Sequence, residues 1–319
     1  MAKKKKEISQ EKTLPSKKHL AAILIALTLI ITSCFVVFFL FLQPSEVTFS
    51  LNAAIIDQLG ESDPSLSNST FVESVTNILE SRNFTVTYYN EAIDVNFFKK
   101  LAEHNYGIIV LRAHSALRED NSTVDLFTSE KYANDKYQWE RDHGLVVIGE
   151  YLYRPGEYYF AITSLFVDNL AGRFPKSIII AMGCWSLKPK CEQMAKAFLD
   201  KGAIAYVGWT DIIYPQDTDQ ETATLLEMFL AKNRTLADAV AITKPHTYIT
   251  YGITSKMEFY PPSVSVGDLK ISDLIAEEKN SKASATFNNS ELFPFLIANI
   301  NFESKDFQRY KLGPYVNCW

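Results

Sequence analysis

The stretch Ser177–Cys184 (SIIIAMGC) decides the fold, because an unbroken apolar run that ends at a glycine is typical of a strand buried on both faces. An earlier run of the same kind, Gly107–Arg112 (GIIVLR), leads into Ala113, His114 and Ser115. Strands buried on both faces belong to parallel sheets that helices cover. The two runs therefore predict an α/β fold.

The flanking segments continue this pattern in both directions along the chain. Leu51–Asp57 (LNAAIID), Phe84–Tyr89 (FTVTYY) and Ala203–Trp209 are further expected strands, and stretches with apolar residues at helical spacing lie between them. Alternating strands and helices predict a mostly parallel sheet between two helical layers. We expect this three-layer αβα sandwich to occupy residues 51–260.

Two parts of the chain break the alternation. Residues 116–160 are polar and rich in tyrosine, so we expect an insertion over the sheet, either a hairpin or a lid. Beyond Pro261 and Pro262 the pattern weakens, and residues 261–319 form an expected C-terminal extension.

Leu20–Leu42 has no charged residue and is long enough to cross a hydrocarbon core of about 30 Å as a helix. Seven lysines lie in residues 1–19 and none in the linker 43–50, so the positive-inside rule places the N-terminus in the cytoplasm. The sequence therefore predicts a single-pass signal-anchor in the cell membrane, with the lipid bilayer as its partner and the main domain outside the cytoplasm.

Two alternatives for this segment are export signals that are cleaved. One would be cleaved by signal peptidase. The other would be cleaved before Cys34, with a lipid attached to that residue, since Ile31-Thr32-Ser33-Cys34 resembles a lipobox. Signal peptides have apolar regions of about 7–15 residues, whereas here Phe35–Leu42 extends the run past either cleavage point. The length favours an uncleaved anchor.

Composition and charge limit the function of the main domain. The chain is 47% hydrophobic and 13% aromatic. These fractions are typical of a folded globular protein. The first 43 residues hold seven lysines and two glutamates, which leaves 25 basic and 35 acidic side chains and a net charge of −10 in the remainder. A nucleic-acid partner is not expected, because phosphate binding needs clustered cations. No ligand spacing for a metal and no cofactor motif is seen.

The sequons and cysteines fit an exported domain. Of the four cysteines, Cys184, Cys191 and Cys318 follow the anchor, and this odd number predicts one pair and one free thiol, with Cys191–Cys318 as the candidate disulfide. Five candidate glycosylation sites are Asn68, Asn83, Asn121, Asn233 and Asn288.

Three reactive side chains follow predicted strands directly. Asp57, His114 and Cys184 would meet in one crevice, because the carboxyl ends of parallel strands share one edge of the sheet. A histidine beside a cysteine can generate the thiolate nucleophile. Each also has an ordinary structural explanation: a buried cysteine packs as a small hydrophobe, and an aspartate at a strand end binds turn amides.

These residues resemble a known family. The order strand, His-small, strand, Gly-Cys is similar to that of the caspase, gingipain, legumain and separase superfamily of cysteine endopeptidases. The resemblance covers about residues 50–255 and lies nearest to the prokaryotic gingipain-like or CHAT-like branch. Its motifs are Ala54–Leu59 (AIIDQL), Val110–Ser115 (VLRAHS), Ala181–Cys184 (AMGC) and Gly202–Trp209 (GAIAYVGW).

The resemblance implies a caspase-like fold and thiol endopeptidase activity on polypeptides. His114 would be the general base and acid and Cys184 the nucleophile, with the backbone N–H groups of Cys184 and Ser115 as oxyanion donors. Asp57 or Asp211 would form a specificity pocket that selects Arg or Lys before the cut bond. Trp209 would lie beside this substrate-binding region, unless it only packs against the sheet edge.

The sequence also departs from the family pattern, and this keeps two alternatives open. Ser115 replaces the usual glycine after the histidine, and no second specificity loop is recognisable. These departures would be explained by a catalytically inactive ectodomain that binds a peptide or partner. A flavodoxin-like ligand-binding domain ranks last, because Gln58–Glu61 lacks the glycine spacing of a phosphate-binding loop.

Overall fold

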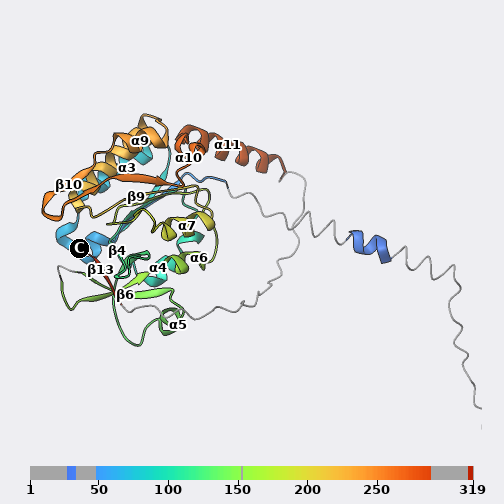
Figure 1. The fold of residues 1–319 in the computed structure, drawn as a ribbon. Helices are drawn as coiled ribbons and strands as arrows, with labels where there is room; N and C mark the ends of the chain where they lie inside the picture. The colour runs from blue at the N-terminus through green and yellow to red at the C-terminus, as the bar shows by residue number, and fades with distance from the viewer. Residues whose placement is uncertain (1–26, 34–47, 152–153, 289–314, 319) are drawn as a thin grey trace, which may run out of the picture. The chain divides into compact units, whose positions relative to one another are not determined.

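The computed structural model of the chain describes residues 27–33, 48–151, 154–288 and 315–318 (Figure 1). The chain divides into two units, Met1–Glu46 and Val47–Trp319. In the first unit, residues 27–33 are helical, and the rest of the predicted span 20–42 lies outside the described residues. None of the helices in these described ranges is both long enough and apolar enough to cross a membrane. The anchor stays a prediction.

The second unit is built on a six-stranded sheet with the strand order β12-β9-β8-β3-β1-β2. All neighbouring strands are parallel except β12, which runs antiparallel to β9. This confirms the predicted α/β fold with a mostly parallel sheet. The strands are β1 (Asn52–Asp57), β2 (Thr85–Tyr89), β3 (Ile108–Arg112), β8 (Ile178–Ala181), β9 (Ala205–Trp209) and β12 (Met257–Tyr260).

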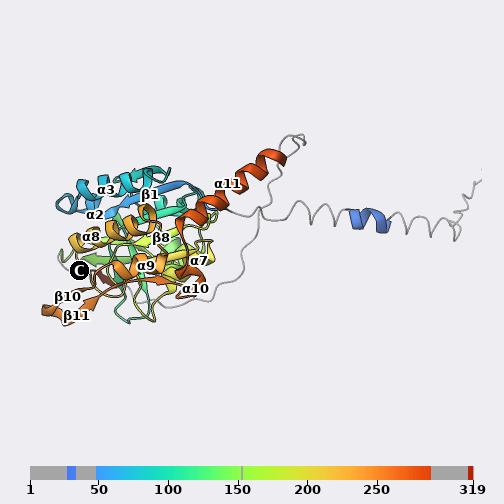
Figure 2. The ribbon, with the colours of Figure 1, turned by 90° about the horizontal axis from the view of Figure 1, so that it is seen from above.

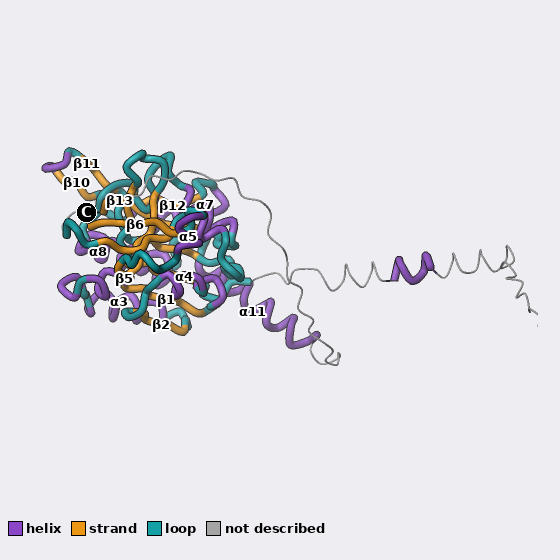
Figure 3. Tube along the Cα trace, turned by 90° about the horizontal axis from the view of Figure 1, so that it is seen from below, coloured by secondary structure: helices purple, strands orange, loops and turns teal. Residues whose placement is uncertain are grey.

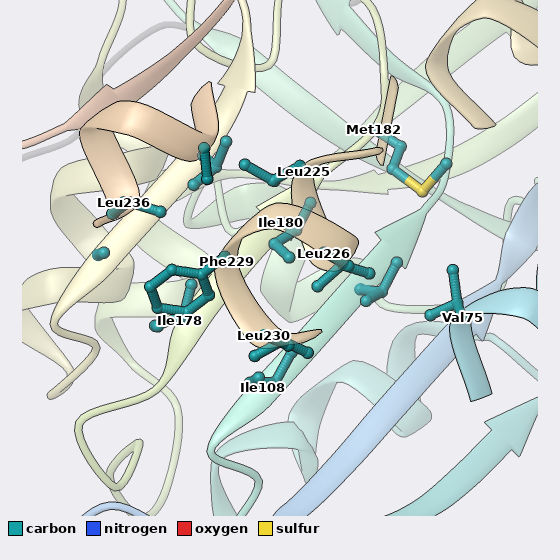
Figure 4. Close-up of a cluster of buried hydrophobic side chains, with 14 of the residues drawn as sticks. Val75, Ile108, Ile178, Ile180, Met182, Leu225, Leu226, Phe229, Leu230 and Leu236 are labelled. Carbon is teal, nitrogen blue, oxygen red and sulfur yellow. The ribbon is translucent and has the colours of Figure 1, made fainter. Parts of the chain in front are cut away.

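Helices cover both faces of this sheet, and alternating strand residues face each layer. Ile178 and Ile180 pack with Phe229 in one buried cluster (Figure 4), whereas Ile179 packs with Phe198 in the other. The first face is covered by α3 (Ser69–Glu80), α8 (Pro215–Leu226), a π-helical turn (Glu227–Ala231) and α9 (Leu236–Ile242). The second is covered by α4 (Val95–Lys99), α6 (Ser164–Asp168) and α7 (Gln193–Asp200).

The predicted insertion is a second sheet, with the order β13-β6-β7-β5-β4. It forms an antiparallel half-barrel in which only β13 runs parallel to its neighbour, β6. The insertion thus begins and ends close to the expected 116–160, but it is a sheet of several strands rather than a single hairpin or a lid. Its parts are β4 (Ser115–Leu117), β5 (Val124–Lys131), α5 (Gln138–Asp142), β6 (Val146–Tyr151), β7 (Tyr158–Ile162) and, from the end of the chain, β13 (Tyr315–Cys318).

This inserted sheet is a fixed part of the domain. Leu126, Val146 and Phe160 belong to the same buried cluster as Ile109 and Ile179 of the six-stranded sheet. Packing at interior density does not allow such a layer to lift as a unit without exposing the cluster. A mobile lid is therefore not what residues 116–160 form.

The remaining elements lie at the edges of the second unit. A hairpin of β10 (His246–Tyr248) and β11 (Ile253–Ser255) projects from the body (Figures 2 and 3). Within the predicted C-terminal extension 261–319, the described elements are α10 (Val264–Gly267), α11 (Ile271–Asn288) and β13. The short helix α2 (Gln58–Ser62) follows β1 directly and leads into the site.

Candidate functional site

His114 and Cys184 line the same cavity, which has a volume of about 350 Å³. His114 follows β3 and Cys184 follows β8, and these two strands are neighbours in the sheet. The remaining walls come from residues after β1 and β9, which flank this pair of strands. The expectation that functional side chains gather at the carboxyl ends of parallel strands thus located the crevice and two of its side chains.

Gly183 is required because the loops after β3 and β8 approach closely. A Cβ atom at this position would lie 2.3 Å from Ser115 Oγ and 2.5 Å from the carbonyl oxygen of Ala113. Any larger residue would push the two loops apart. The glycine therefore sets the spacing between the loop that carries His114 and the loop that carries Cys184.

Ser115 ties the same two loops together. Its hydroxyl donates a hydrogen bond to the carbonyl oxygen of Cys184 at 2.6 Å, and its side chain is fully buried. Ser115 is not among the residues that line the cavity, whereas Cys184 is. The geometry thus gives no support to Ser115 N–H as an oxyanion donor and assigns Ser115 a positioning contact instead.

His114 is held by residues outside its own strand. Its backbone N–H donates to Gln58 Oε1 at 2.8 Å, and Gln58 Nε2 donates to the Tyr151 hydroxyl at 2.9 Å. The centroids of the His114 and Tyr151 rings are 4.6 Å apart. Burial, followed by the positive charge of Arg112, lowers the pKa of His114 to about 3. The imidazole is therefore neutral at pH 7.

Cys184 is also buried, with 7% of its surface exposed. Its Sγ lies 3.5 Å from both the N–H nitrogen and the carbonyl oxygen of Ile213. Burial raises the pKa of the Cys184 thiol to about 11, against a smaller lowering by the Ile213 hydrogen bond. In this conformation the pair is a neutral thiol and a neutral imidazole.

No family model matches this chain, and no curated protein matches it. The resemblance to caspase-like peptidases depends only on the motifs quoted above.

Asp57 lies beneath the cavity in a buried ion network rather than on its wall. Its carboxylate accepts from Arg112 Nη1 at 2.6 Å, from Gly60 N–H at 2.9 Å and from the Tyr88 hydroxyl at 3.0 Å. Asp219 holds the other side of the Arg112 guanidinium, at 2.8 Å from Nε and 2.9 Å from Nη2. Asp57 therefore caps the turn after β1 and neutralises Arg112, so the structure does not support its predicted role in binding substrate.

The other two predicted substrate-binding residues are also not part of the cavity wall, although the charge of Asp211 acts on the Cys184 thiol. Asp211 accepts a hydrogen bond from the N–H of Ile212 at 2.8 Å. Trp209 is fully buried in the core, and its indole N–H donates to Thr218 Oγ1 at 2.9 Å. Neither is among the cavity-lining residues. Trp209 thus takes the packing role that was its alternative.

Sequence reasoning missed three residues that shape the site. Gln58 directly follows Asp57 at the end of β1, so the strand-end rule could have flagged it. Tyr151 lies in the tyrosine-rich insertion, where no periodicity singled it out from the other tyrosines. Ile213 acts through its backbone, which leaves no signal in the sequence.

The predicted sequons differ in accessibility. Asn83 and Asn121 are exposed, whereas Asn68 donates to Asp219 Oδ2 and caps α3, and the Asn233 amide oxygen accepts from the N–H of Ser272. The side chain of Asn288 lies outside the described residues. Carbohydrate on the amide nitrogen of Asn68 would disturb its hydrogen bond to Asp219, whereas the Asn233 contact uses the amide oxygen, which glycosylation leaves in place.

Cys191 is a free thiol in the structure, with its Sγ 3.3 Å from the carbonyl oxygen of Asn121. The side chain of Cys318 lies outside the described residues. The structure therefore gives no support to the predicted Cys191–Cys318 disulfide. Across the described residues, His, Cys, Asp and Glu side chains form no group of three or more that could hold a metal ion.

Proposed function

We propose that the second unit is a cysteine endopeptidase in which Cys184 attacks the peptide carbonyl and His114 acts as general base. The observation that carries this proposal is that the two side chains, 70 residues apart in sequence, line one cavity at the carboxyl ends of adjacent parallel strands. Such convergence of a nucleophile and a base in a concave site is the usual arrangement for covalent catalysis.

The chemistry follows from the neutral state of both groups. His114 takes the thiol proton as Cys184 Sγ forms its bond to the carbonyl carbon, and the Cys184 backbone N–H would stabilise the oxyanion. His114 then donates that proton to the leaving amine as the C–N bond breaks. Water, deprotonated by His114, hydrolyses the thioester and returns the thiol. A neutral imidazole can accept the proton, which a pre-formed imidazolium cannot.

The family resemblance and the predicted anchor complete the proposal. The caspase-like order, with His after one strand and Gly-Cys after the next strand of the core, agrees with the observed neighbours β3 and β8. If Leu20–Leu42 spans the bilayer as its sequence predicts, the peptidase is tethered at the outer surface of the cell membrane. Its substrates would then be polypeptides near that surface.

A peptide-binding module without catalysis is the second candidate. It is favoured by the burial of both reactive groups and by the thiol pKa of about 11, which disfavours the nucleophilic thiolate. Both candidates use the same cavity. They differ in whether a bound peptide is cleaved.

The test is hydrolysis of casein and of a peptide library by the full-length chain in detergent micelles. Cys184→Ala and His114→Ala should each lower turnover by roughly 10³-fold or more, because a nucleophile and its base act as one unit. Cys191→Ser, which changes another buried thiol outside the cavity, is the matched control and should keep its activity. Equal turnover by Cys184→Ala would overturn the proposal, and peptide retention without cleavage by the unaltered chain would establish the binding module.

A further inference from the structure

We propose that this peptidase selects an uncharged, apolar side chain before the cut bond, rather than the Arg or Lys that its family resemblance implies. This inference depends on the proposed function, because it concerns the same cavity. Leu59 and Leu66, which follow β1, line it on one side, and Ile212 and Ile213, which follow β9, line it on the other. A substrate side chain that enters beside Cys184 would meet aliphatic groups.

Three of the carboxylates near the cavity are bound to arginines, and Asp211, whose charge acts on the Cys184 thiol, does not line it. Asp57 and Asp219 hold the Arg112 guanidinium beneath it, and both are almost completely buried. Asp63 is the single carboxylate among the described lining residues, and it forms an ion pair with Arg154. A substrate cation in the cavity would therefore lose its water without meeting an unpaired carboxylate among the described residues of the wall, and such a desolvated charge is disfavoured.

Three other polar side chains line the cavity, those of Thr218, His114 and Tyr214, and none of them carries a negative charge. The Thr218 hydroxyl donates to the carbonyl oxygen of Met182 at 3.0 Å and accepts from the Trp209 indole N–H. These groups leave burial of apolar surface as the main source of binding energy for the substrate side chain.

The size of the cavity fits this assignment. A volume of about 350 Å³ lies at the small end of ligand pockets, which suits one substrate side chain and the adjoining backbone. An apolar pocket discriminates between side chains by roughly 10–200-fold. We expect that range of preference for Leu, Met or Phe over Lys.

The experiment measures the rate at which acyloxymethyl ketones with Leu, Phe, Lys or Asp before the reactive group form an adduct at Cys184 of the full-length chain. The Leu or Phe probe should react at least about 10-fold faster than the Lys probe. A Lys probe that reacts equally fast or faster would overturn the inference and leave the peptidase proposal standing. No adduct from any probe, or equal labelling after His114→Ala, would remove the peptidase proposal and this inference with it.

Leu66→Asp tests directly whether the apolar wall of the cavity sets the preference for the substrate side chain. Leu66→Asn is the uncharged control. Leu66 is half-buried, so it is the lining aliphatic residue among these four that best tolerates a polar substitution. Leu66→Asp should raise the Lys-to-Leu rate ratio by about 10-fold, and Leu66→Asn should not. Equal ratios in both variants would contradict the pocket assignment. If Leu66→Asp unfolds, Leu66→Ala replaces it and should shift the preference from Leu toward Phe.

Discussion

The six-stranded sheet and the inserted sheet contribute to the site in different ways. The parallel sheet supplies both reactive side chains from its strand ends, whereas none of the described residues that line the cavity belongs to β4–β7. The inserted sheet instead places Tyr151 and Phe127 against the His114 ring. One sheet thus positions both side chains of the proposed site, and the other contributes to the burial that lowers the pKa of His114.

The largest expected effect concerns the burial of His114 by the inserted sheet. It should appear in the pH dependence of Cys184 alkylation. Burial under the inserted sheet keeps His114 neutral, so no imidazolium lowers the pKa of the thiol, which is about 11. The thiolate fraction then rises about tenfold per pH unit, or roughly 10³-fold from pH 7 to pH 10. Iodoacetamide labelling measures it in a background in which Cys34, Cys191 and Cys318 are replaced by serine, so that Cys184 is the one remaining thiol. A rate that is already flat between pH 6 and 8 would show a thiolate–imidazolium pair.

Removal of the buried cation in each sheet compares their electrostatics. Arg112→Met leaves Asp57 and Asp219 buried without a counter-ion, which should lower the free energy of unfolding by about 3–5 kcal/mol. Arg118→Met in the inserted sheet should cost less, about 1–3 kcal/mol, because burial already raises the pKa of its partner Asp125 and favours neutralisation by a proton. Urea unfolding at pH 7 measures both. Equal losses would show that the two sheets bury charge alike.

Matched truncations test whether the sheets unfold together. Ile109 in β3 and Ile162 in β7 belong to the same buried cluster, and each is at most 1% exposed. Ile109→Ala and Ile162→Ala should each cost about 2–5 kcal/mol and shift one common transition. Circular dichroism and tryptophan fluorescence should then give the same midpoint. Two separate transitions in Ile162→Ala would show that the inserted sheet is an independent unit.

Ser115→Ala should have the smallest effect, at the point where the two sheets meet. Ser115 begins β4 of the inserted sheet and donates to the carbonyl oxygen of Cys184 in the other. Loss of this hydrogen bond should cost about 0.5–1.5 kcal/mol in thermal unfolding. Because the contact positions Cys184, adduct formation there should slow, while alkylation of the chemically denatured chain stays the same. An unchanged adduct rate would limit Ser115 to a structural role.

The same contrast explains how much could be predicted. The strands expected at Leu51–Asp57, Gly107–Arg112 and Ser177–Met182 are close to β1, β3 and β8, because burial on both faces leaves an apolar run in the sequence. The inserted sheet buries aromatic residues through pairings distant in sequence, such as Val146 with Ile162, and no local period reports them.

The site shows the same division. The rule that ligands gather at strand ends found His114 and Cys184, because sheet topology alone brings them together. It could not show that Asp57 is paired with Arg112, 55 positions away, or that Asp219 completes the pair from 107 positions away. Side-chain pairing of this kind depends on three-dimensional packing that one sequence does not encode locally.

The place of the inserted sheet within the chain has a consequence for folding kinetics. Strands β3 and β8 pair side by side, although the whole of β4–β7 lies between them in sequence. Closing so long a loop has an entropic cost that precedes the stabilisation from the Ile109–Ile179 pairing. An inserted sheet that forms early shortens the effective loop and lowers this cost. The strands β5, β6 and β7 should therefore form before the central sheet is complete during refolding. The inserted sheet would then pack against His114 before His114 and Cys184 come together.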